Sequence, residues 1–274
     1  MFKIIIMALL IFIGMVGYDN ITDKAQPTTP VQQEQQKVSK HEKSAAMALF
    51  TSLLPPKEEW PSPVHKFYLA FNMDEVIDPI RQNPNWTGLD AMSRDIPQAL
   101  IAIEDHAFYN HGAIAVEGIL RAALANINAG EVVQGGSTLT QQFVKNVFLS
   151  HEQSMERKIE EAVLSLMLED NYSKDEILEL YLNTTYFGAG STGIKQASRT
   201  YFGKAPSALT LAEAAVIASL PYAPTGLNPL ENPDGCKKRQ LLVLAAMHKY
   251  GMINQGQLAE AKAEKIRLTN GTVM

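Results

Sequence analysis

The stretch from Gln134 to Asn146 reads QGGSTLTQQFVKN and carries the clearest structural signal in the chain. Its Gly-Gly turn, followed by apolar residues at helical spacing, predicts a helix from Ser137 to Phe148. A turn of this kind exposes backbone N–H groups at the positive end of the helix dipole, where an anion binds well. Thr138, Gln142 and Lys145 fall on one face of that helix. A polar face that ends in lysine favours a phosphate-bearing ligand.

The segment before this stretch, residues 103–111 (IEDHAFYNH), carries an acidic pair beside aromatic residues and a histidine. In a partly desolvated cleft, Glu104 or Asp105 would serve as a general base. The same residues are also compatible with an ordinary solvated loop. In the same plain interpretation, Ser137 would serve only as the N-cap of the helix that follows it.

The segment after it, residues 156–161 (ERKIEE), places two cations beside a glutamate. On a helix, Arg157 and Glu161 are four residues apart and Lys158 and Glu161 are three apart, which is close enough for ion pairs. Taken alone, this pattern predicts an ordinary salt-bridged helix surface. A fourth segment, residues 174–183, is predicted to be mainly structural.

Helical patterns extend over most of the chain after residue 99. Ser173 with Glu176 and Thr210 with Glu213 have the spacing of capping boxes, and each pair predicts a helix start. Strand signals are scarce, and a short strand is predicted only near residues 67–71, so the predicted fold class is mainly α. Further helices are predicted at residues 114–128, 152–170, 174–182, 211–220, 233–250 and 255–265.

The amino terminus differs from the rest of the chain in composition. An unbroken apolar run from Ile4 to Gly17 would form a helix of about 21 Å, which is short of the roughly 30 Å hydrocarbon core of a bilayer. This predicts a signal anchor or a signal peptide over residues 1–18, and the lack of an A-x-A cleavage site favours the anchor. We expect a flexible polar stalk at 19–43, an irregular lead-in at 44–98, a core at 99–265 and a C-terminal tail at 266–274.

Length and composition exclude several classes of protein. The 274 residues, 46% of them hydrophobic, allow one sizeable domain with a buried core. The net charge of −5 argues against a general nucleic-acid binder. The one cysteine, Cys236, can form no intramolecular disulfide and is expected to be structural. The C-x-x-C and H-E-x-x-H metal patterns are absent, and His106 and His111 are not expected to form a metal pair.

Taken in order, these segments resemble glycosyltransferase family 51, the peptidoglycan glycosyltransferase domain of class A penicillin-binding proteins and monofunctional transglycosylases. The resemblance covers roughly residues 65–265 and rests on five ordered motifs. The first four are E-D-x-x-F-x-x-H from Glu104, G-G-S-T-x-T-Q-Q at 135–142, R-K-x-x-E from Arg157, and K-x-x-I-L-x-x-Y-L-N at 174–183. The fifth, R-R-x-x-V-L, is only partly met, because Gln240 follows Arg239.

The resemblance implies a lysozyme-like helical domain with a smaller membrane-associated jaw, preceded by an N-terminal hydrophobic anchor. It also implies polymerisation of lipid II into β-1,4-linked glycan, with inversion and release of undecaprenyl pyrophosphate. Glu104 would be the general base. Glu161 would be a second catalytic glutamate that binds a divalent cation, Mg²⁺ or Mn²⁺, or orients the cationic residues. The implied substrate-binding residues are Asp105, Phe108, His111, Ser137, Thr138, Gln141, Gln142, Lys145, Arg157 and Lys158.

Partners and location are implied by the same resemblance. The partners would be lipid II, the growing glycan chain and the lipid bilayer, with other cell-wall synthesis proteins as further candidates and no nucleic acid. The protein would cross the cytoplasmic membrane once and hold its catalytic domain on the extracytoplasmic face. Phe143, Val147, Phe148 and Leu149 are candidates for contact with the bilayer, although core packing is the plainer expectation.

Some features set limits on the resemblance. Ala113 and Ala115 stand where many members have glycine and aspartate, so we expect the loop after His111 to be reshaped. A lysozyme-like hydrolase, which also uses paired carboxylates, and a catalytically inactive envelope scaffold remain as alternatives. The sequence lacks S-x-x-K and K-T-G, the serine signature of penicillin-binding transpeptidases, so no transpeptidase activity is expected. A naturally monofunctional protein and a part of a longer one fit equally.

Overall fold

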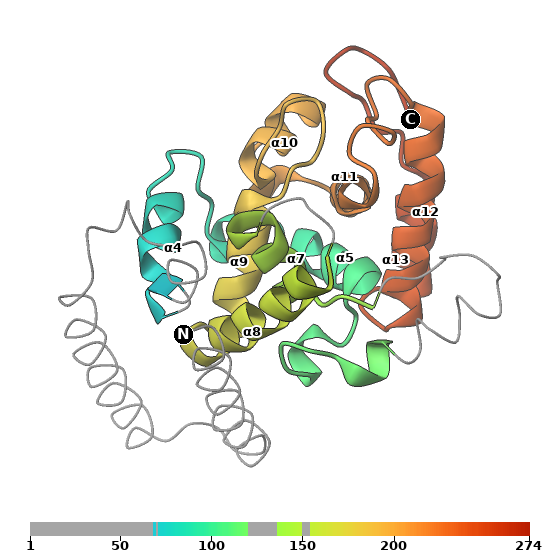
Figure 1. Cartoon of the computed structure of the whole chain (residues 1–274). Coiled ribbons are helices and arrows are strands. Elements are labelled where there is room, and N and C mark those ends of the chain that lie inside the picture. Colours follow the sequence, from blue (N-terminus) through green and yellow to red (C-terminus); the bar gives the residue numbers. More distant parts are fainter. Residues whose placement is uncertain (1–67, 70, 120–135, 150–153) are drawn as a thin grey trace. The chain divides into compact units, whose positions relative to one another are not determined.

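Helices form the regular structure of the computed structural model, which describes residues 68–69, 71–119, 136–149 and 154–274 (Figure 1). No strand occurs among these residues, which carry two isolated β-bridges. The predicted mainly α fold class is confirmed. The α-helices are α4 (Asp74–Arg81), α5 (Asp95–Glu104), α7 (Leu139–Phe148), α8 (Met155–Asn171), α9 (Lys174–Thr184), α10 (Ile194–Phe202), α11 (Leu211–Ser219), α12 (Pro233–Lys249) and α13 (Gln255–Ala263), and the short 3₁₀ helices are η2 (Leu89–Ala91), η3 (Phe108–Asn110), η4 (Pro206–Ala208) and η5 (Leu220–Tyr222).

The two predicted capping boxes are confirmed. Ser173 and Thr210 each accept a hydrogen bond from the backbone N–H three residues further on, at the starts of α9 and α11. Glu176 and Glu213 accept one in return from the backbone N–H of the cap residue. Two backbone donors that a helix start leaves unpaired are thereby satisfied at each site. The sequence signals therefore fixed where these helices begin.

Other boundaries differ from the predicted ones. α7 begins at Leu139 and its N-cap is Thr138, so the interpretation in which Ser137 caps this helix is wrong. Residues 68, 69 and 71 are helical, so the strand predicted there is also wrong. A run of five residues is too short for its period to separate a strand from a helix. α5 begins at Asp95, inside the stretch that was expected to be irregular.

The last nine residues fold back onto the domain. Ile266 and Met274 exchange two backbone hydrogen bonds, at 3.0 and 2.8 Å. Ile266 and Leu268 are buried. The backbone N–H of Thr269 donates to the carbonyl of Tyr201 in α10 at 3.0 Å. The predicted C-terminal tail is therefore attached to the domain through Ile266, Leu268 and the contact of Thr269 with Tyr201.

Several predicted features lie outside the described residues. These are the hydrophobic segment at 1–18, the stalk at 19–43, residues 120–128 of the helix predicted from residue 114, and Gly135 of the Gly-Gly turn. In the ranges that the structure does describe, no helix combines the length and the apolar character that crossing a membrane requires.

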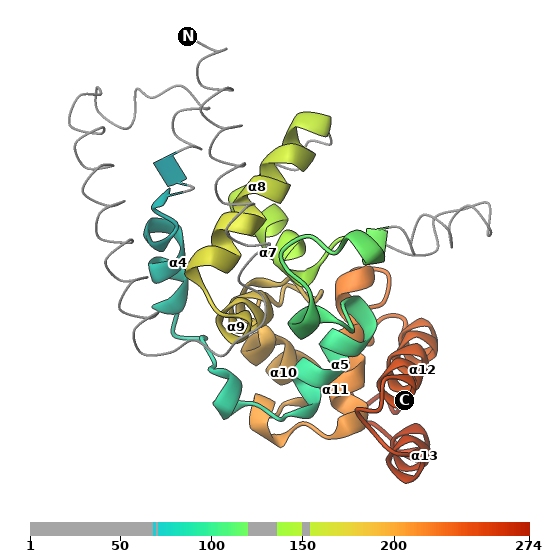
Figure 2. The same ribbon diagram turned by 90° about the horizontal axis from the view of Figure 1, so that it is seen from below.

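The helices from α5 onward pack in two groups, which Figures 1 and 2 show from two sides. In the first group, α11 lies against α5 and α12, and α12 also contacts α5 and α13. In the second group, α7 lies against α8 and α9. α10 contacts helices of both groups, α9 and α11. Fully buried apolar side chains form the core, among them Leu139, Phe143, Ile177, Val216 and Leu244.

Cys236 of α12 belongs to this core. Its side chain is fully buried, and its Sγ lies 3.9 Å from Ser219 Oγ. Burial raises the pKa of the Cys236 thiol to about 11. Because the thiolate is the reactive form, a thiol of this kind is inert near neutral pH. The structural role expected for Cys236 fits this environment.

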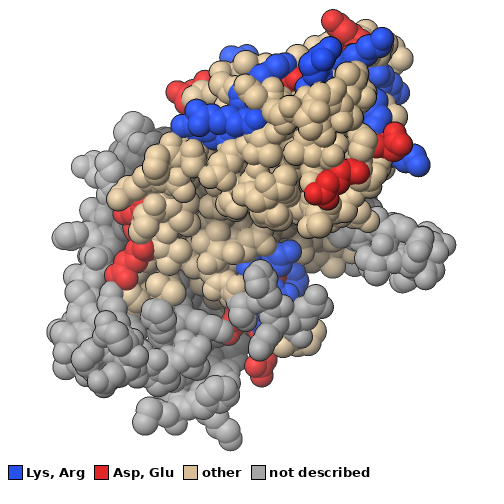
Figure 3. Space-filling view, turned by 90° about the horizontal axis from the view of Figure 1, so that it is seen from above, with Lys and Arg blue, Asp and Glu red and all other residues tan. Residues whose placement is uncertain are grey.

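Charged side chains are unevenly spread on the face drawn in Figure 3. Lysine and arginine side chains gather with some acidic ones toward one end of this face, and its middle is mainly uncharged. Surface charge alone therefore does not locate an active site on this face. The hydrogen bonds and ion pairs of individual carboxylates locate one better.

Candidate active site

Glu104 is the last residue of α5, and its carboxylate meets a side chain from the other helical group. Gln142 of α7 donates a hydrogen bond from Nε2 to Glu104 Oε2 at 3.0 Å. Burial raises the pKa of Glu104; the Gln142 hydrogen bond and the charges of Arg239 and Lys145 lower it in part, and the charge of Asp105 raises it. The side chain is still partly exposed. The carboxylate is therefore poorly solvated and yet accessible, as a general base needs to be.

A second hydrogen bond holds Gln142 from the protein interior. Tyr181 of α9 donates from its hydroxyl to Gln142 Oε1 at 3.0 Å and is only 1% exposed. Helices α5, α7 and α9 are thus linked by two hydrogen bonds in series, from Tyr181 to Gln142 and from Gln142 to Glu104. Tyr181 lies in the segment that was predicted to be mainly structural. It is 39 residues from Gln142 in the sequence, so no helical periodicity signals this contact.

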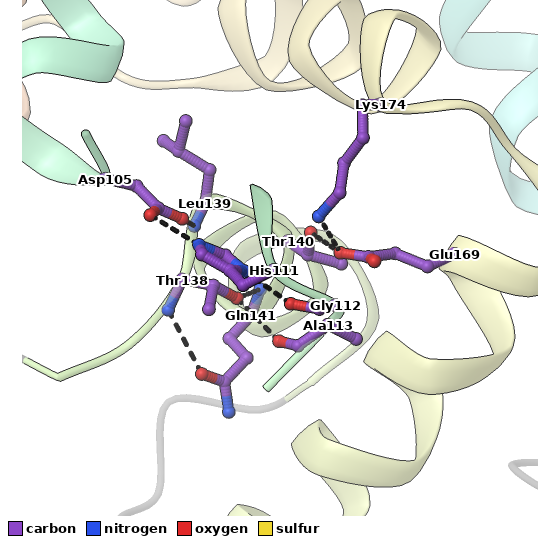
Figure 4. Close-up of polar contacts among 10 residues, drawn as sticks. All are labelled: Asp105, His111, Gly112, Ala113, Thr138, Leu139, Thr140, Gln141, Glu169 and Lys174. Carbon is purple, nitrogen blue, oxygen red and sulfur yellow. Dashed lines mark hydrogen bonds and ion pairs between the residues drawn. The ribbon is translucent and has the colours of Figure 1, made fainter. Parts of the chain in front are cut away.

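Asp105 joins the loop after α5 to the start of α7 (Figure 4). Its Oδ1 lies 2.6 Å from His111 Nε2, and its Oδ2 accepts a hydrogen bond from the Leu139 N–H at 3.1 Å. The other ring nitrogen of His111 lies 2.6 Å from the carbonyl oxygen of Gly112. Both ring nitrogens face acceptors, so the ring satisfies both partners only as an imidazolium. Burial lowers the pKa of His111, but the hydrogen bonds to Asp105 and Gly112 outweigh it and raise the pKa overall.

The first turn of α7 uses its own polar groups for capping (Figure 4). Thr138 Oγ1 accepts from the Gln141 N–H at 3.1 Å and donates to the carbonyl of Ala113 at 2.8 Å. Gln141 Oε1 accepts in turn from the Thr138 N–H at 3.1 Å. The Leu139 N–H donates to Asp105, so the first and third backbone N–H groups of α7, those of Leu139 and Gln141, are both hydrogen-bonded to side chains. These two amides are therefore not free for an anion. The anion site expected at the Gly135-Gly136-Ser137 turn and the substrate contacts of Thr138 and Gln141 stay predictions.

Phe108 supports the same loop from within the core. It is fully buried in η3, and Lys174 Nζ lies 4.5 Å from the centroid of its ring. Lys174 also pairs with Glu169 at 2.6 Å, and Thr140 Oγ1 donates to the same Glu169 oxygen at 2.6 Å (Figure 4). η3 is thereby tied to α7, α8 and α9. The predicted contact of Phe108 with substrate stays a prediction, and its observed contacts are those of a support.

A second carboxylate, Glu161 of α8, lies between two cations. It is 2% exposed, its Oε1 pairs with Lys158 Nζ, and its Oε2 lies 3.8 Å from Arg157 Nη1. Lys158 Nζ also donates to Ser137 Oγ at 3.1 Å, immediately before α7. Among the described residues, Arg157 Nε is buried and has no hydrogen-bond partner. Glu161 is therefore the common counter-ion of two cations that lie beside the start of α7.

This arrangement bears on the metal role predicted for Glu161. A divalent ion there would compete with Lys158 and Arg157 for the same two oxygens. In the described part of the chain, no group of three or more His, Cys, Asp or Glu side chains is arranged to hold a metal ion. His111 binds Asp105, and His106 stacks on Tyr250 with ring centroids 4.1 Å apart. The donor set around Glu161 fits a counter-ion better than a resident metal site, and the metal role stays a prediction.

Arg239 reaches the site from α12, although its motif is only partly met. Its guanidinium carbon lies 4.0 Å from the ring centroid of Tyr222, whose side chain is 68% exposed. Gln240, which replaces the second arginine of the motif, is fully buried and donates from Nε2 to the Ala212 carbonyl at 2.8 Å. An arginine at that position would have to bury its charge. Gln240 is therefore a neutral tie between α12 and α11, and the cationic contribution comes from Arg239.

The two alanines after His111 leave the polar contacts of the loop in place. Ala113 is 2% exposed, and its carbonyl is the acceptor for Thr138 Oγ1. The carbonyl of Ala115 accepts from the Ile119 N–H at 3.0 Å, in a turn of helix. Both contacts use the backbone. The identities of these two side chains therefore do not decide whether the contacts form.

The candidates for bilayer contact on α7 divide into two kinds. Phe143 is fully buried, so the plainer expectation of core packing is confirmed for it. Val147, Phe148 and Leu149 are partly exposed, and Lys145 is exposed beside them. The end of α7 therefore presents both apolar and basic groups at the surface.

Comparisons with known proteins match the segments that build this site. A family model described as Transglycosylase matches residues 73–248. A protein of Cupriavidus necator that is named as a transglycosylase is 41% identical over 194 residues, which is 71% of this chain and 84% of that protein. Penicillin-binding protein 2D of Bacillus subtilis is 45% identical over 66% of this chain and 26% of its own length. Penicillin-binding protein 1A of Neisseria flavescens is 44% identical over 68% of this chain and 23% of its own length.

The chain thus matches most of one relative and about a quarter of the length of the two penicillin-binding proteins. The matched residues 73–248 contain α5, α7, α8 and the Arg239 position of α12. These are the elements that hold Glu104, Gln142, Glu161 and their cations. The resemblance that the sequence motifs indicated is confirmed: the chain belongs to the transglycosylase family and is an enzyme of the peptidoglycan glycosyltransferase class.

Proposed function

We propose that this enzyme polymerises lipid II into β-1,4-linked glycan strands, with inversion at the anomeric carbon and release of undecaprenyl pyrophosphate. The observation that carries the proposal is the Glu104 carboxylate, which is desolvated, partly accessible and held by Gln142. The growing chain is the donor, and the 4-hydroxyl of an incoming lipid II is the acceptor.

In this proposal Glu104 takes the proton of the acceptor hydroxyl as the new glycosidic bond forms. A carboxylate that has lost part of its hydration accepts a proton more readily, because burial raises the pKa of Glu104 toward the working pH. Gln142 donates to Oε2. The direction of the carboxylate is thus set before substrate binds.

The departing pyrophosphate gains negative charge, which cations must stabilise. Lys158 and Arg157 share Glu161 as counter-ion, and Lys158 reaches the start of α7 through Ser137. Lys145 is exposed on α7, and its positive charge lowers the pKa of Glu104. We assign the binding of the pyrophosphate to these three cations. A divalent cation, if one takes part, would add charge at the pyrophosphate oxygens in the same region.

A glycan hydrolase is the less favourable assignment. Hydrolysis of a glycoside uses two carboxyl groups that flank the scissile bond. The other acidic residues of the first and third motifs are engaged otherwise: Asp105 binds His111 and the Leu139 N–H, and Glu161 binds Lys158. An inactive scaffold is likewise less favourable, because it would have no need of a desolvated glutamate with a dedicated hydrogen-bond donor.

The membrane setting is also part of the proposal. Lipid II and undecaprenyl pyrophosphate reside in a bilayer, and the apolar run at Ile4–Gly17 together with the partly exposed apolar end of α7 would keep the enzyme at its surface. We propose a single-pass location with the domain on the extracytoplasmic face. We also propose glycosyl transfer without transpeptidation for this chain, since it lacks S-x-x-K and K-T-G.

Incubation of the detergent-purified protein with labelled lipid II and Mg²⁺ tests the proposal. The comparison is between wild type, Glu104→Gln and a matched control, Glu260→Gln, in which an exposed carboxylate of α13 is neutralised. We expect muramidase-sensitive polymer from wild type and from the control, and none from Glu104→Gln. Polymer from Glu104→Gln at the wild-type rate would remove Glu104 as the base. Absence of polymer from a folded wild type that binds lipid II would favour the scaffold.

A further inference from the structure

Tyr181 is a fully buried tyrosine whose hydroxyl is directed to the group that holds the proposed base. Its side chain is 1% exposed in α9, and its hydroxyl donates to Gln142 Oε1 at 3.0 Å. On the other side of the same amide, Gln142 Nε2 donates to Glu104 Oε2 at 3.0 Å. We infer that Tyr181 is a positioning residue that acts on Glu104 through Gln142, an inference that rests on the proposed function of Glu104 as the base.

The direction of the two hydrogen bonds follows from the chemistry of the groups. An amide side chain offers one acceptor end and one donor end, and a carboxylate can only accept. Glu104 therefore requires the NH₂ end of Gln142. If the amide were turned over, its oxygen would face the carboxylate and its NH₂ would face the phenol. The carboxylate disfavours that orientation, because two acceptors would then face each other, and the Tyr181 hydroxyl adds a second hydrogen bond to the observed one.

Tyr181 can fulfil this task because it keeps its proton. Burial raises the pKa of Tyr181 well above the usual range of a tyrosine, and the charge of Glu104 raises it as well. The hydroxyl is therefore a donor at every pH at which the enzyme would work. The hydrogen bond from Tyr181 to Gln142 Oε1 is therefore not lost by ionisation of the phenol in that pH range.

The consequence for Glu104 concerns its ionisation and its direction. The hydrogen bond from Gln142 lowers the pKa of Glu104 against the larger effect of burial, which raises it. Without the Tyr181 hydroxyl, the amide of Gln142 would keep only its hydrogen bond to Glu104, and this partly exposed side chain would be held less firmly in one rotamer. The base would then be protonated at a higher pH and would point at the acceptor hydroxyl less often.

The plain alternative is that Tyr181 only fills the core. Tyr201 allows the two roles to be separated, because it is the matched case in the same domain. It is fully buried in α10, and its hydroxyl donates to the Phe187 carbonyl at 2.8 Å, a backbone partner. Replacing either tyrosine by phenylalanine removes one hydroxyl from one buried hydrogen bond. Only the change at Tyr181 alters a contact of Gln142.

The test is the pH dependence of lipid II polymerisation by wild type, Tyr181→Phe and Tyr201→Phe. For Tyr181→Phe we expect the acidic limb of the kcat profile to move upward by about half to one pH unit. Near that limb, kcat should fall about three- to tenfold with KM unchanged within about twofold. For Tyr201→Phe we expect an unshifted limb even if the melting temperature falls. Equal profiles for the two variants would overturn the inference.

A double-variant cycle checks that the effect passes through Gln142. If it does, Tyr181→Phe should change little in a Gln142→Ala background, because the amide is already absent. An undiminished effect of Tyr181→Phe in that background would overturn the proposed route. Additional loss that matches the change in melting temperature would point to packing alone, against the inference.

A readout that needs no activity separates this inference from the proposed function. The pKa of Glu104 can be followed by NMR in protein labelled with ¹³C at glutamate carboxyl carbons, with Glu104→Gln to assign the signal. We expect a higher pKa in Tyr181→Phe than in wild type and no change in Tyr201→Phe. If wild type makes no polymer but this shift is seen, the proposed function fails and the link from Tyr181 to Glu104 stands. An unchanged pKa would end the inference whatever the activity.

Discussion

Glu104 and Glu161 are two glutamates of the same domain in opposite surroundings. Glu104 ends α5, is partly exposed, and receives its one described hydrogen bond from the neutral amide of Gln142. Glu161 lies within α8, is 2% exposed, and faces Lys158 and Arg157 directly. The more exposed carboxylate is thus the one without a direct cationic partner among the described residues, and the more deeply buried one has two.

This difference suits the two residues to different tasks. A close cation favours the charged form of a carboxylate, so a carboxylate without one accepts a proton more readily. A carboxylate that holds cations in place needs such contacts. The surroundings therefore fit the proposal in which Glu104 transfers the proton and Glu161 arranges the cations that would bind the pyrophosphate. Substitutions at Glu104, Glu161 and His111 test that division.

Neutralising the base should have the largest effect. For Glu104→Gln we expect polymerisation to fall by about 10²- to 10⁴-fold, the range that a positioned general base supplies. Binding of lipid II, measured by filter retention or fluorescence, should change little, because the amide keeps the shape of the side chain. A large loss of binding with a near-normal kcat would assign Glu104 to substrate binding.

Neutralising the counter-ion should have a smaller effect of a different kind. For Glu161→Gln we expect a loss of about 10- to 100-fold, since one charge-assisted contact amounts to about 1.5–3 kcal/mol and 1.4 kcal/mol is a factor of ten. The concentration of Mg²⁺ that gives half-maximal activity should stay the same as in wild type. A strong rise in that concentration would show that Glu161 binds the metal.

His111, through its contact with Asp105, holds the loop that follows Glu104. Because the folded-state pKa of His111 is raised above its unfolded value, the stability that it contributes is present below about pH 6.5 and is lost as the pH rises through the folded pKa. For His111→Gln we expect the free energy of unfolding to fall by about 1–3 kcal/mol at pH 6. The gap to wild type should narrow toward pH 9. Urea unfolding at both pH values measures this difference in the free energy of unfolding. A difference that does not depend on pH would contradict the charged state of His111.

The smallest effect concerns the stability of Glu104→Gln. A folded pKa above the unfolded one means that the ionised carboxylate opposes folding once the pH exceeds the unfolded value. At pH 7 we therefore expect Glu104→Gln to be as stable as wild type or more stable, by up to about 1 kcal/mol. The difference should vanish near pH 3, where both states are protonated. Lower stability of the variant at pH 7 would mean that Glu104 is a structural residue.

Local features were predictable wherever the determining contacts lie within one turn of helix. The capping boxes at Ser173 and Thr210 are of this kind, because the cap and its partner are three residues apart. The pairing of Lys158 and Arg157 with Glu161 also follows from helical spacing. The exact start of α7 was less predictable, since Ser137 and Thr138 are both good caps. The partner that selects Thr138 is the carbonyl of Ala113, 25 residues away.

The sequence by itself determined the family and the helical fold class, because the ordered motifs and the helical spacing can be read directly along the chain. It also supplied the candidate site residues, whose roles stay predictions. Only the tertiary structure decided what those residues do to one another. Gln142 meets Glu104 across 38 residues, and Tyr181 meets Gln142 across 39. The desolvation of Glu104, the burial of Glu161 and the contact of Lys158 with Ser137 likewise depend on how the helices pack. The physical reason is that hydrogen-bond partners and burial are properties of distances in space, which sequence spacing fixes only within a single helix.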